Sequence, residues 1–295
     1  MISRAPRAGR FAFSPVALAL AGLTAAFAFG ACSRGAASSP PPSDASSTAG
    51  APPAKAASAV DPRLGQALAA LDKAAAEMGA VEAAAVRSRI EASPEDFLNG
   101  LDTVLAERVL DPDRFARVDK VAPPLGSDFV PKDLVSLDGI LPTARAGLSL
   151  RSAAADALSA MVRAAKADGV ALVAGSSYRS WNYQKTVFDR EVRTYGEETA
   201  RSESAEPGRS QHQLGTALDF SPIDDSFAKS GAFAWLSGHA REFGFSRSYP
   251  DGMEKVTGYR PESWHWRWIG AAAAALEGKY FDGVQQYLIE FLSDY

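Results

Sequence analysis

Residues 208–220 read GRSQHQLGTALDF and hold one of only three histidines in the 295-residue chain. His212 and Asp219 lie seven positions apart. That spacing suits neither one face of a helix, where neighbours are three or four apart, nor one face of a strand, where the spacing is even. Gly215 lies between them and tolerates the backbone conformations of a sharp bend. The stretch therefore predicts either a bend that brings both side chains to one point, or a helix-to-strand junction with two separately satisfied polar residues.

The segments around this stretch mix helical and strand patterns. Their periodicity predicts helices over 151–166, 181–195, 231–243 and from Gly283 onward, and strands over 170–174 and 264–269. In the last strand three tryptophans alternate with His265, Arg267 and Ile269, so the two sets should lie on opposite faces. Tyr183 and two valines are the expected buried anchors of the helix over 181–195. No βαβ repeat is present, and the pattern therefore predicts the α+β class.

The first 31 residues predict export. Three arginines precede an uncharged run, 16–30, and small residues lie immediately before Cys32, the only cysteine. A lone cysteine cannot close an intramolecular disulfide, and the segment resembles a bacterial lipoprotein signal whose cysteine is lipidated after cleavage. We therefore expect a signal peptide over 1–31, lipidation of Cys32 and a cell-envelope location with a lipid anchor to a membrane. Ordinary secretion or an uncleaved anchor is the alternative, because Phe29 replaces the usual leucine.

Composition divides the remainder of the chain. Residues 32–60 are mostly Ala, Ser and Pro, and such a segment cannot bury enough apolar surface to offset its ordering entropy, so it predicts a disordered tether. Helical spacing over 61–110, with a helix start at Ser93-Pro94, predicts a helical hairpin in front of a domain over 111–295. Net charge is -4 without a block of like charge, which argues against nucleic-acid binding. We expect a monomer.

A second histidine lies in RPESWHWRWIG, residues 260–270. Glu262 and His265 are three apart, where an irregular loop becomes a strand. With His212 and Asp219 they supply two imidazoles and one carboxylate, a recurrent zinc set that leaves the fourth tetrahedral position open for water. The spare carboxylate can accept a proton from that water.

These motifs resemble those of a known family. SQHQLGTALDF and ESWHWRWIG are similar to the metal motifs of the VanY-type D-alanyl-D-alanine carboxypeptidases, Ser-x-His-x-x-Gly-x-Ala-x-Asp and Glu-x-Trp-His. SSYRSWNYQ is similar to their Tyr-Arg-Ser-x-x-x-Gln segment, which lines the substrate cleft. The resemblance covers roughly residues 118–275. It implies a hedgehog/DD-peptidase-like fold, with a small antiparallel sheet flanked by helices and preceded here by the hairpin.

Carried over by position, the resemblance implies one zinc ion held by His212, Asp219 and His265, with Glu262 as general base. The side chains implied to bind substrate are Arg179, Gln184, Ser210, Tyr178 and Trp264. Arg179 would also stabilise the oxyanion.

Some polar residues fall outside that assignment. Gln211 stands where glutamate is common, and Glu206 where a smaller residue is frequent, which bears on fine substrate preference. His239 is expected to be a packed or surface residue. Ser176 and Ser177 lack a Gly-x-Ser-x-Gly elbow, which argues against a serine hydrolase.

The resemblance implies a zinc D,D-carboxypeptidase that removes the terminal D-alanine from peptidoglycan stem peptides. Two alternatives use the same scaffold, an LD-carboxypeptidase and a stem-peptide endopeptidase. A third alternative is a non-catalytic, zinc-containing cell-wall binding module. The presence of Glu262 favours an enzyme over that module, because only catalysis needs a proton acceptor beside the ligands.

Overall fold

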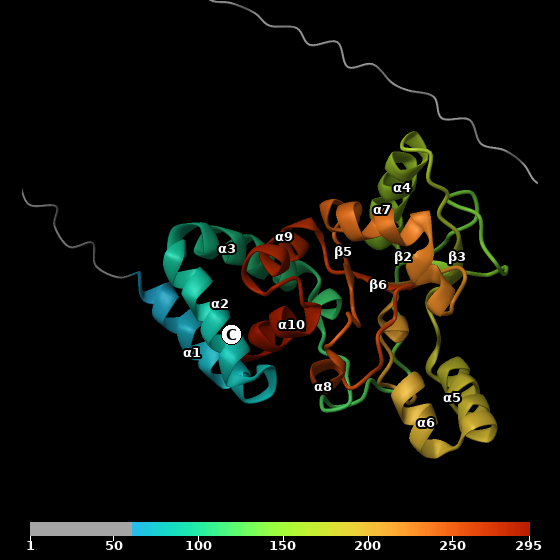
Figure 1. Ribbon diagram of the computed structural model, residues 1–295, viewed down its shortest axis with the longest axis horizontal. Coiled ribbons are helices and arrows are strands. Elements are labelled where there is room, and N and C mark those ends of the chain that lie inside the picture. The colour runs from blue at the N-terminus through green and yellow to red at the C-terminus, as the bar shows by residue number, and fades with distance from the viewer. Residues whose placement is uncertain (1–60) are drawn as a thin grey trace, which may run out of the picture. The chain divides into compact units, whose positions relative to one another are not determined.

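Two groups of elements build residues 61–295, the part of the chain that the computed structural model describes (Figure 1). One group is entirely helical, and the other is a small antiparallel sheet with covering helices. The predicted signal peptide, Cys32 and the predicted tether fall within residues 1–60, outside the described residues. Within 61–295, no helix combines the length and apolar character needed to cross a bilayer.

Five helices share the first hydrophobic core. They are α1 (Pro62–Met78), α2 (Ala80–Ala92), α3 (Pro94–Leu110), α9 (Ala271–Tyr280) and α10 (Gln285–Asp294). The Asp61 side chain accepts a hydrogen bond from the backbone of Arg63 and begins α1, and Gly79, at φ +100°, separates α1 from α2. The hairpin expected over 61–110 is thus three helices. Their apolar faces share one buried core with α9 and α10.

The second group is built around a four-stranded antiparallel sheet in the order β3-β4-β6-β5. Its strands are β3 (Ala174–Ser176), β4 (Ala217–Phe220), β5 (Phe245–Arg247) and β6 (His265–Trp268). A second antiparallel pair consists of β1 (Leu134–Ser136) and β2 (Ser149–Arg151). Asp219 on the central strand β4 is opposite His265 on β6. Small antiparallel sheets among helices confirm the α+β prediction.

The two faces of the sheet differ in chemistry. Trp264, Trp266 and Trp268 belong to a buried cluster with residues of α4 (Ser152–Ala167) and α7 (Gly231–His239). Ile269, which alternates with them, belongs to the helical core instead. The predicted alternation along this strand is therefore confirmed, and it leaves Asp219 and His265 on the face away from the tryptophans.

Three sequence predictions differ from the structure. The strand expected over 170–174 forms at β3, Ala174–Ser176, because only there does the backbone pair with β4. The helix over 231–243 is α-helical only to His239 and ends as a 3-10 turn, η4 (Ala240–Phe243). In α5 (Trp181–Tyr195) Tyr183 is 42% exposed and only Gln184 is buried. The reason is that α5 packs chiefly against the short α6 (Glu197–Glu203), as Figure 1 shows.

Candidate metal centre and its cleft

A short 3-10 turn, η2 (Gln211–Leu214), carries His212 toward the sheet. The Ser210 side chain caps it by accepting a hydrogen bond from the His212 backbone at 3.3 Å. Gly215 then adopts the left-handed conformation, φ +70°, and the chain enters β4. A β-carbon at Gly215 would lie 3.0 Å from the side chains of Leu134 and Arg151. Glycine is therefore needed at the bend for both its backbone conformation and its lack of volume.

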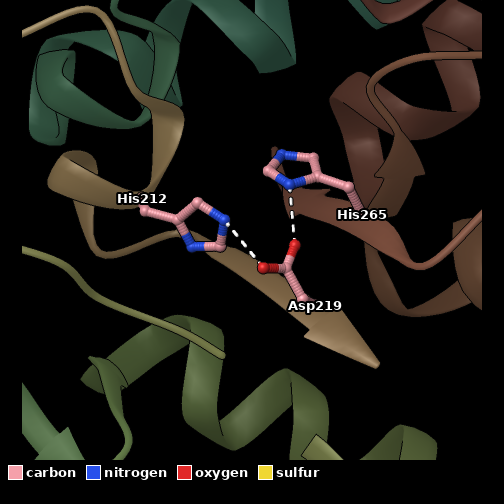
Figure 2. A group of neighbouring side chains, drawn as sticks. All are labelled: His212, Asp219 and His265. Carbon is pink, nitrogen blue, oxygen red and sulfur yellow. Dashed lines mark hydrogen bonds and ion pairs between the residues drawn. The ribbon is translucent and has the colours of Figure 1, made fainter. Parts of the chain in front are cut away.

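The bend brings His212 and Asp219 to one point, where His265 joins them (Figure 2). His212 Nε2 lies 3.2 Å from Asp219 Oδ2, and His265 Nδ1 lies 2.9 Å from Asp219 Oδ1. One potential ligand atom from each residue falls within 4.8 Å of the others, and all three residues are buried. Such a group could hold a metal ion.

Hydrogen bonds orient both imidazoles. His212 Nδ1 lies 2.8 Å from the carbonyl oxygen of Ser177 and must donate to it, which leaves the lone pair on Nε2. His265 Nε2 lies 3.1 Å from Gln211 Oε1, so the second ring presents Nδ1 to Asp219. The two nitrogens and one carboxylate oxygen are the donor types that zinc takes in three-ligand sites, and metal-binding histidines commonly donate their other N–H in this way.

The electrostatics favour deprotonated ligands. Burial, followed by the nearby Arg179, lowers the pKa of His212 to about 4. Burial alone would raise the pKa of Asp219, but His212, His265 and Arg179 outweigh it and hold that pKa well below its usual range. Near neutral pH His212 is therefore neutral and Asp219 is charged, as metal binding requires.

The metal centre opens into a cleft of about 270 Å³. Glu262 lines it, and its Oε2 lies 3.8 Å from His265 Nδ1. Burial, and then the negative charge of Asp219, raises the pKa of Glu262 to about 8. A carboxyl with a pKa near neutrality can both accept and return a proton.

Arg179 is fixed in the wall of the same cleft. Its guanidinium donates to Ser176 Oγ at 3.0 Å, to Gln184 Oε1 at 3.4 Å and to Asp219 Oδ2 at 2.7 Å. Gln184 in turn donates to the carbonyl of Ala205 at 2.7 Å. A cation is thus held beside the metal centre with little freedom to move.

The other residues predicted to bind substrate lie in different places. Ser210 and Trp264 line the cleft, and both are almost fully buried. Tyr178 is not among the cleft-lining residues, and its backbone N–H donates to Ser149. His239 lies on the surface, where its ring contacts the Glu242 carboxylate at 3.2 Å.

The sequence did not identify several residues that shape this site. Tyr249 packs its ring 4.9 Å from the His265 ring, and Arg260 pairs with Glu203 and Asp225 beside the cleft. Arg260 lies two positions before Glu262, which was a usable signal. Ser177 acts through its backbone carbonyl, so no side-chain pattern could have indicated it.

Comparison with known proteins places the site in a family context. A family model described as VanY, D-alanyl-D-alanine carboxypeptidase, matches residues 147–271. YodJ of Bacillus subtilis (strain 168), which is named as a carboxypeptidase, is 42% identical over 131 residues, or 42% of this chain and 48% of YodJ. The chain spans about half the length of the curated relatives it matches.

Two solved structures are also similar. The LdcB LD-carboxypeptidase is 34% identical with a TM-score of 0.52, over 59% of this chain and 88% of LdcB. A mutant of the vancomycin resistance D,D-pentapeptidase VanY from the VanB-type cassette, in complex with Zn(II), is 28% identical with a TM-score of 0.50. That match covers 61% of this chain and 99% of the other. The three candidate metal ligands lie within the matched residues, 147–271. Glu262 and Arg179 lie there too.

Proposed function

We propose, because this chain belongs to the VanY family of D-alanyl-D-alanine carboxypeptidases, that it is a zinc-dependent D,D-carboxypeptidase which removes the terminal D-alanine from peptidoglycan stem peptides. The observation that carries the proposal is the convergence of His212, Asp219 and His265 beside Glu262 in one cleft. A binding module would need the ligands but has no use for Glu262, a further carboxylate that lines the same cleft without joining the converging set.

The metal ligands, Glu262 and Arg179 have different roles in the proposed reaction. Zinc held by the three ligands would supply a Lewis acid that polarises the scissile carbonyl and acidifies a water. Glu262 accepts the proton of the attacking water and returns it to the leaving amine. Arg179 donates to the substrate carboxylate or to the developing oxyanion, and its fixed position means that little reorganisation accompanies the reaction.

The first test is mass spectrometry of stem peptides incubated with the full chain. A pentapeptide ending in D-Ala-D-Ala should lose one alanine, and the same peptide with a C-terminal amide should resist. Rejection of the amide is expected because an exopeptidase reads the free carboxylate. Equal cleavage of both would favour a stem-peptide endopeptidase, and no cleavage of any stem peptide would favour the binding module.

An LD-carboxypeptidase is the second candidate, and the similarity to the LdcB structure supports it. A tetrapeptide whose single terminal D-alanine follows an L-centre separates the two activities. A D,D-carboxypeptidase should process the pentapeptide, and this tetrapeptide should accumulate. Faster loss of alanine from the tetrapeptide would replace the D,D assignment.

We also propose that the enzyme acts at the cell envelope, anchored through lipid on Cys32, as a monomer. The small residues before this single cysteine and the Ala/Ser/Pro composition after it support the proposal. Acyl labelling should mark the mature protein and should be abolished by Cys32→Ser. A mature chain that begins at another residue and carries no lipid would indicate ordinary secretion.

A further inference from the structure

We infer that Gln211 is the residue that positions the zinc ligand His265, through a hydrogen-bond acceptor that Ser248 holds in place. The inference rests on the zinc centre of the proposed function. It assigns a role to a residue that stands inside the metal motif, between Ser210 and His212.

The contacts of Gln211 are confined to this task. Its side chain is 4% exposed, and Oε1 lies 3.1 Å from His265 Nε2 and 2.7 Å from Ser248 Oγ. Ser248 follows β5 and is 3% exposed, so neither partner is replaced by solvent. The amide oxygen therefore receives two hydrogen bonds in a buried setting, where losing an acceptor is costly.

This arrangement selects the ring atom that binds the metal. A carbonyl oxygen can only accept, so His265 Nε2 must carry the proton and the lone pair remains on Nδ1, facing Asp219. Ser248 Oγ lies 2.7 Å from the same oxygen and 3.4 Å from Gln285 Oε1, so its single hydroxyl proton is donated over the shorter distance to Gln211. Gln211 thus determines both the tautomer and the orientation of His265.

The turn that carries Gln211 also carries the candidate metal ligand His212. Gln211 and His212 are consecutive residues of η2, so one short element supplies the first imidazole and orients the second. Glutamate, common at this position, would offer the same acceptor with a negative charge. Gln211 keeps the acceptor without that charge, and the hydrogen bond, rather than the charge, is what we infer to be required.

The test is the zinc dissociation constant of the full chain, measured by competition with a chromophoric chelator. Gln211→Met keeps the size of the side chain but removes the acceptor, and it should raise the constant by about 10- to 100-fold, the range for outer-shell partners of metal ligands. Gln211→Glu restores an acceptor and should bind zinc within about threefold of the wild type, or more tightly. If Gln211 only fills space, Gln211→Met should bind zinc more tightly than Gln211→Glu, because methionine fills the space without burying a charge.

Gln213 offers a matched control in the same turn. It is fully buried and donates to the carbonyls of Gly126 and Phe129, away from the metal centre. Gln213→Met should reduce stability yet leave the zinc constant unchanged. Ser248→Ala, which leaves Gln211 in place, should weaken zinc binding in the same direction as Gln211→Met but by a smaller factor.

The outcomes separate this inference from the proposed function. If the wild type binds one zinc and both Gln211→Met and Ser248→Ala bind it equally well, the positioning role is wrong and the zinc peptidase stands. An equal loss in Gln213→Met would also overturn it, because any damage to the turn would then suffice. If the wild type itself binds no zinc, the proposed function fails together with this inference.

Discussion

Glu262 lies in the cleft with its carboxylate 3.8 Å from His265 Nδ1, close to the metal ligands without being one of their converging set. If it transfers protons, Glu262→Gln should keep the zinc and the fold, since glutamine has the same shape. Hydrolysis should fall by roughly 10²- to 10⁴-fold, the usual contribution of a general acid–base. Zinc content and the rate of alanine release should be measured on the same sample. Unchanged hydrolysis with zinc bound would assign the proton transfer to another group.

Arg179 gives a second prediction at the scale of one residue. Its guanidinium reaches Ser176, Gln184 and Asp219 at once, and a lysine ammonium cannot span three such directions. Arg179→Lys should therefore lower kcat/KM although charge is kept. The fall should correspond to a loss of about 2 kcal/mol of transition-state stabilisation. A rise in KM alone would indicate ground-state binding of the carboxylate, and a fall in kcat would indicate oxyanion stabilisation. A silent substitution would remove Arg179 from the mechanism.

The bend between η2 and β4 gives a prediction at the scale of an element. Gly215 and Gly139 both have positive φ, at +70° and +83°, but only at Gly215 would a β-carbon meet neighbouring side chains at 3.0 Å. Gly215→Ala should destabilise by roughly 1 to 3 kcal/mol and weaken zinc binding, because the bend sets the distance from His212 to Asp219. Gly139→Ala should lose stability only through its unfavourable backbone conformation, since no atom lies near its added β-carbon. It is therefore the control when the free energy of unfolding is measured in denaturant. Equal effects of the two variants on zinc binding would contradict this role for the bend.

Elements with strong periodicity could be predicted from the sequence. Alternation along 264–269 correctly separated the tryptophans from His265, because a strand buried on both faces must place alternate residues in different environments. The helix over 181–195 was predicted with its observed bounds, but its burial was not. Tyr183 is exposed because α5 lacks a large partner surface, and which elements meet is a tertiary property that local spacing does not contain.

The candidate site, too, could be predicted only in part from the sequence. His212, Asp219, His265 and Glu262 were identifiable because their chemistry is carried by side chains in an ordered motif. The orientation of the rings was not, because it depends on a Ser177 carbonyl and a Gln211 amide whose partners are 35 and 54 positions away in the chain. Hydrogen bonds between such distant segments become visible only when the sheet register is known.

At the scale of the whole molecule, helix α10 of the helical core carries a buried carboxyl group, that of Glu290. Glu290 on α10 is 2% exposed, accepts from Gln286 at 2.9 Å and lies 3.8 Å from Arg117. Its Oε2 has no hydrogen-bond partner among residues 61–295. Burial raises the pKa of this carboxyl to about 7.

A raised carboxyl pKa makes folding depend on pH in a definite direction. Stability from neutral Glu290 is present in full below the ordinary pKa and is lost as pH rises through about 7. Glu290→Gln should therefore gain stability relative to the wild type between about pH 4.5 and pH 8, by on the order of 2 kcal/mol. Urea unfolding of both proteins at the two pH values gives the difference. A difference that stays constant with pH would show that Glu290 does not titrate in this range.

One bend and one strand pairing bring His212, Asp219 and His265 together, and we propose that they hold zinc in a peptidase site. The most direct measurement is the zinc content of the purified full chain by elemental analysis, for the wild type and for His265→Ala. We predict about one zinc per wild-type chain and a loss of most of it in the variant, since two remaining ligands bind zinc poorly. Full zinc occupancy in His265→Ala, or none in the wild type, would show that these three residues do not form a zinc site.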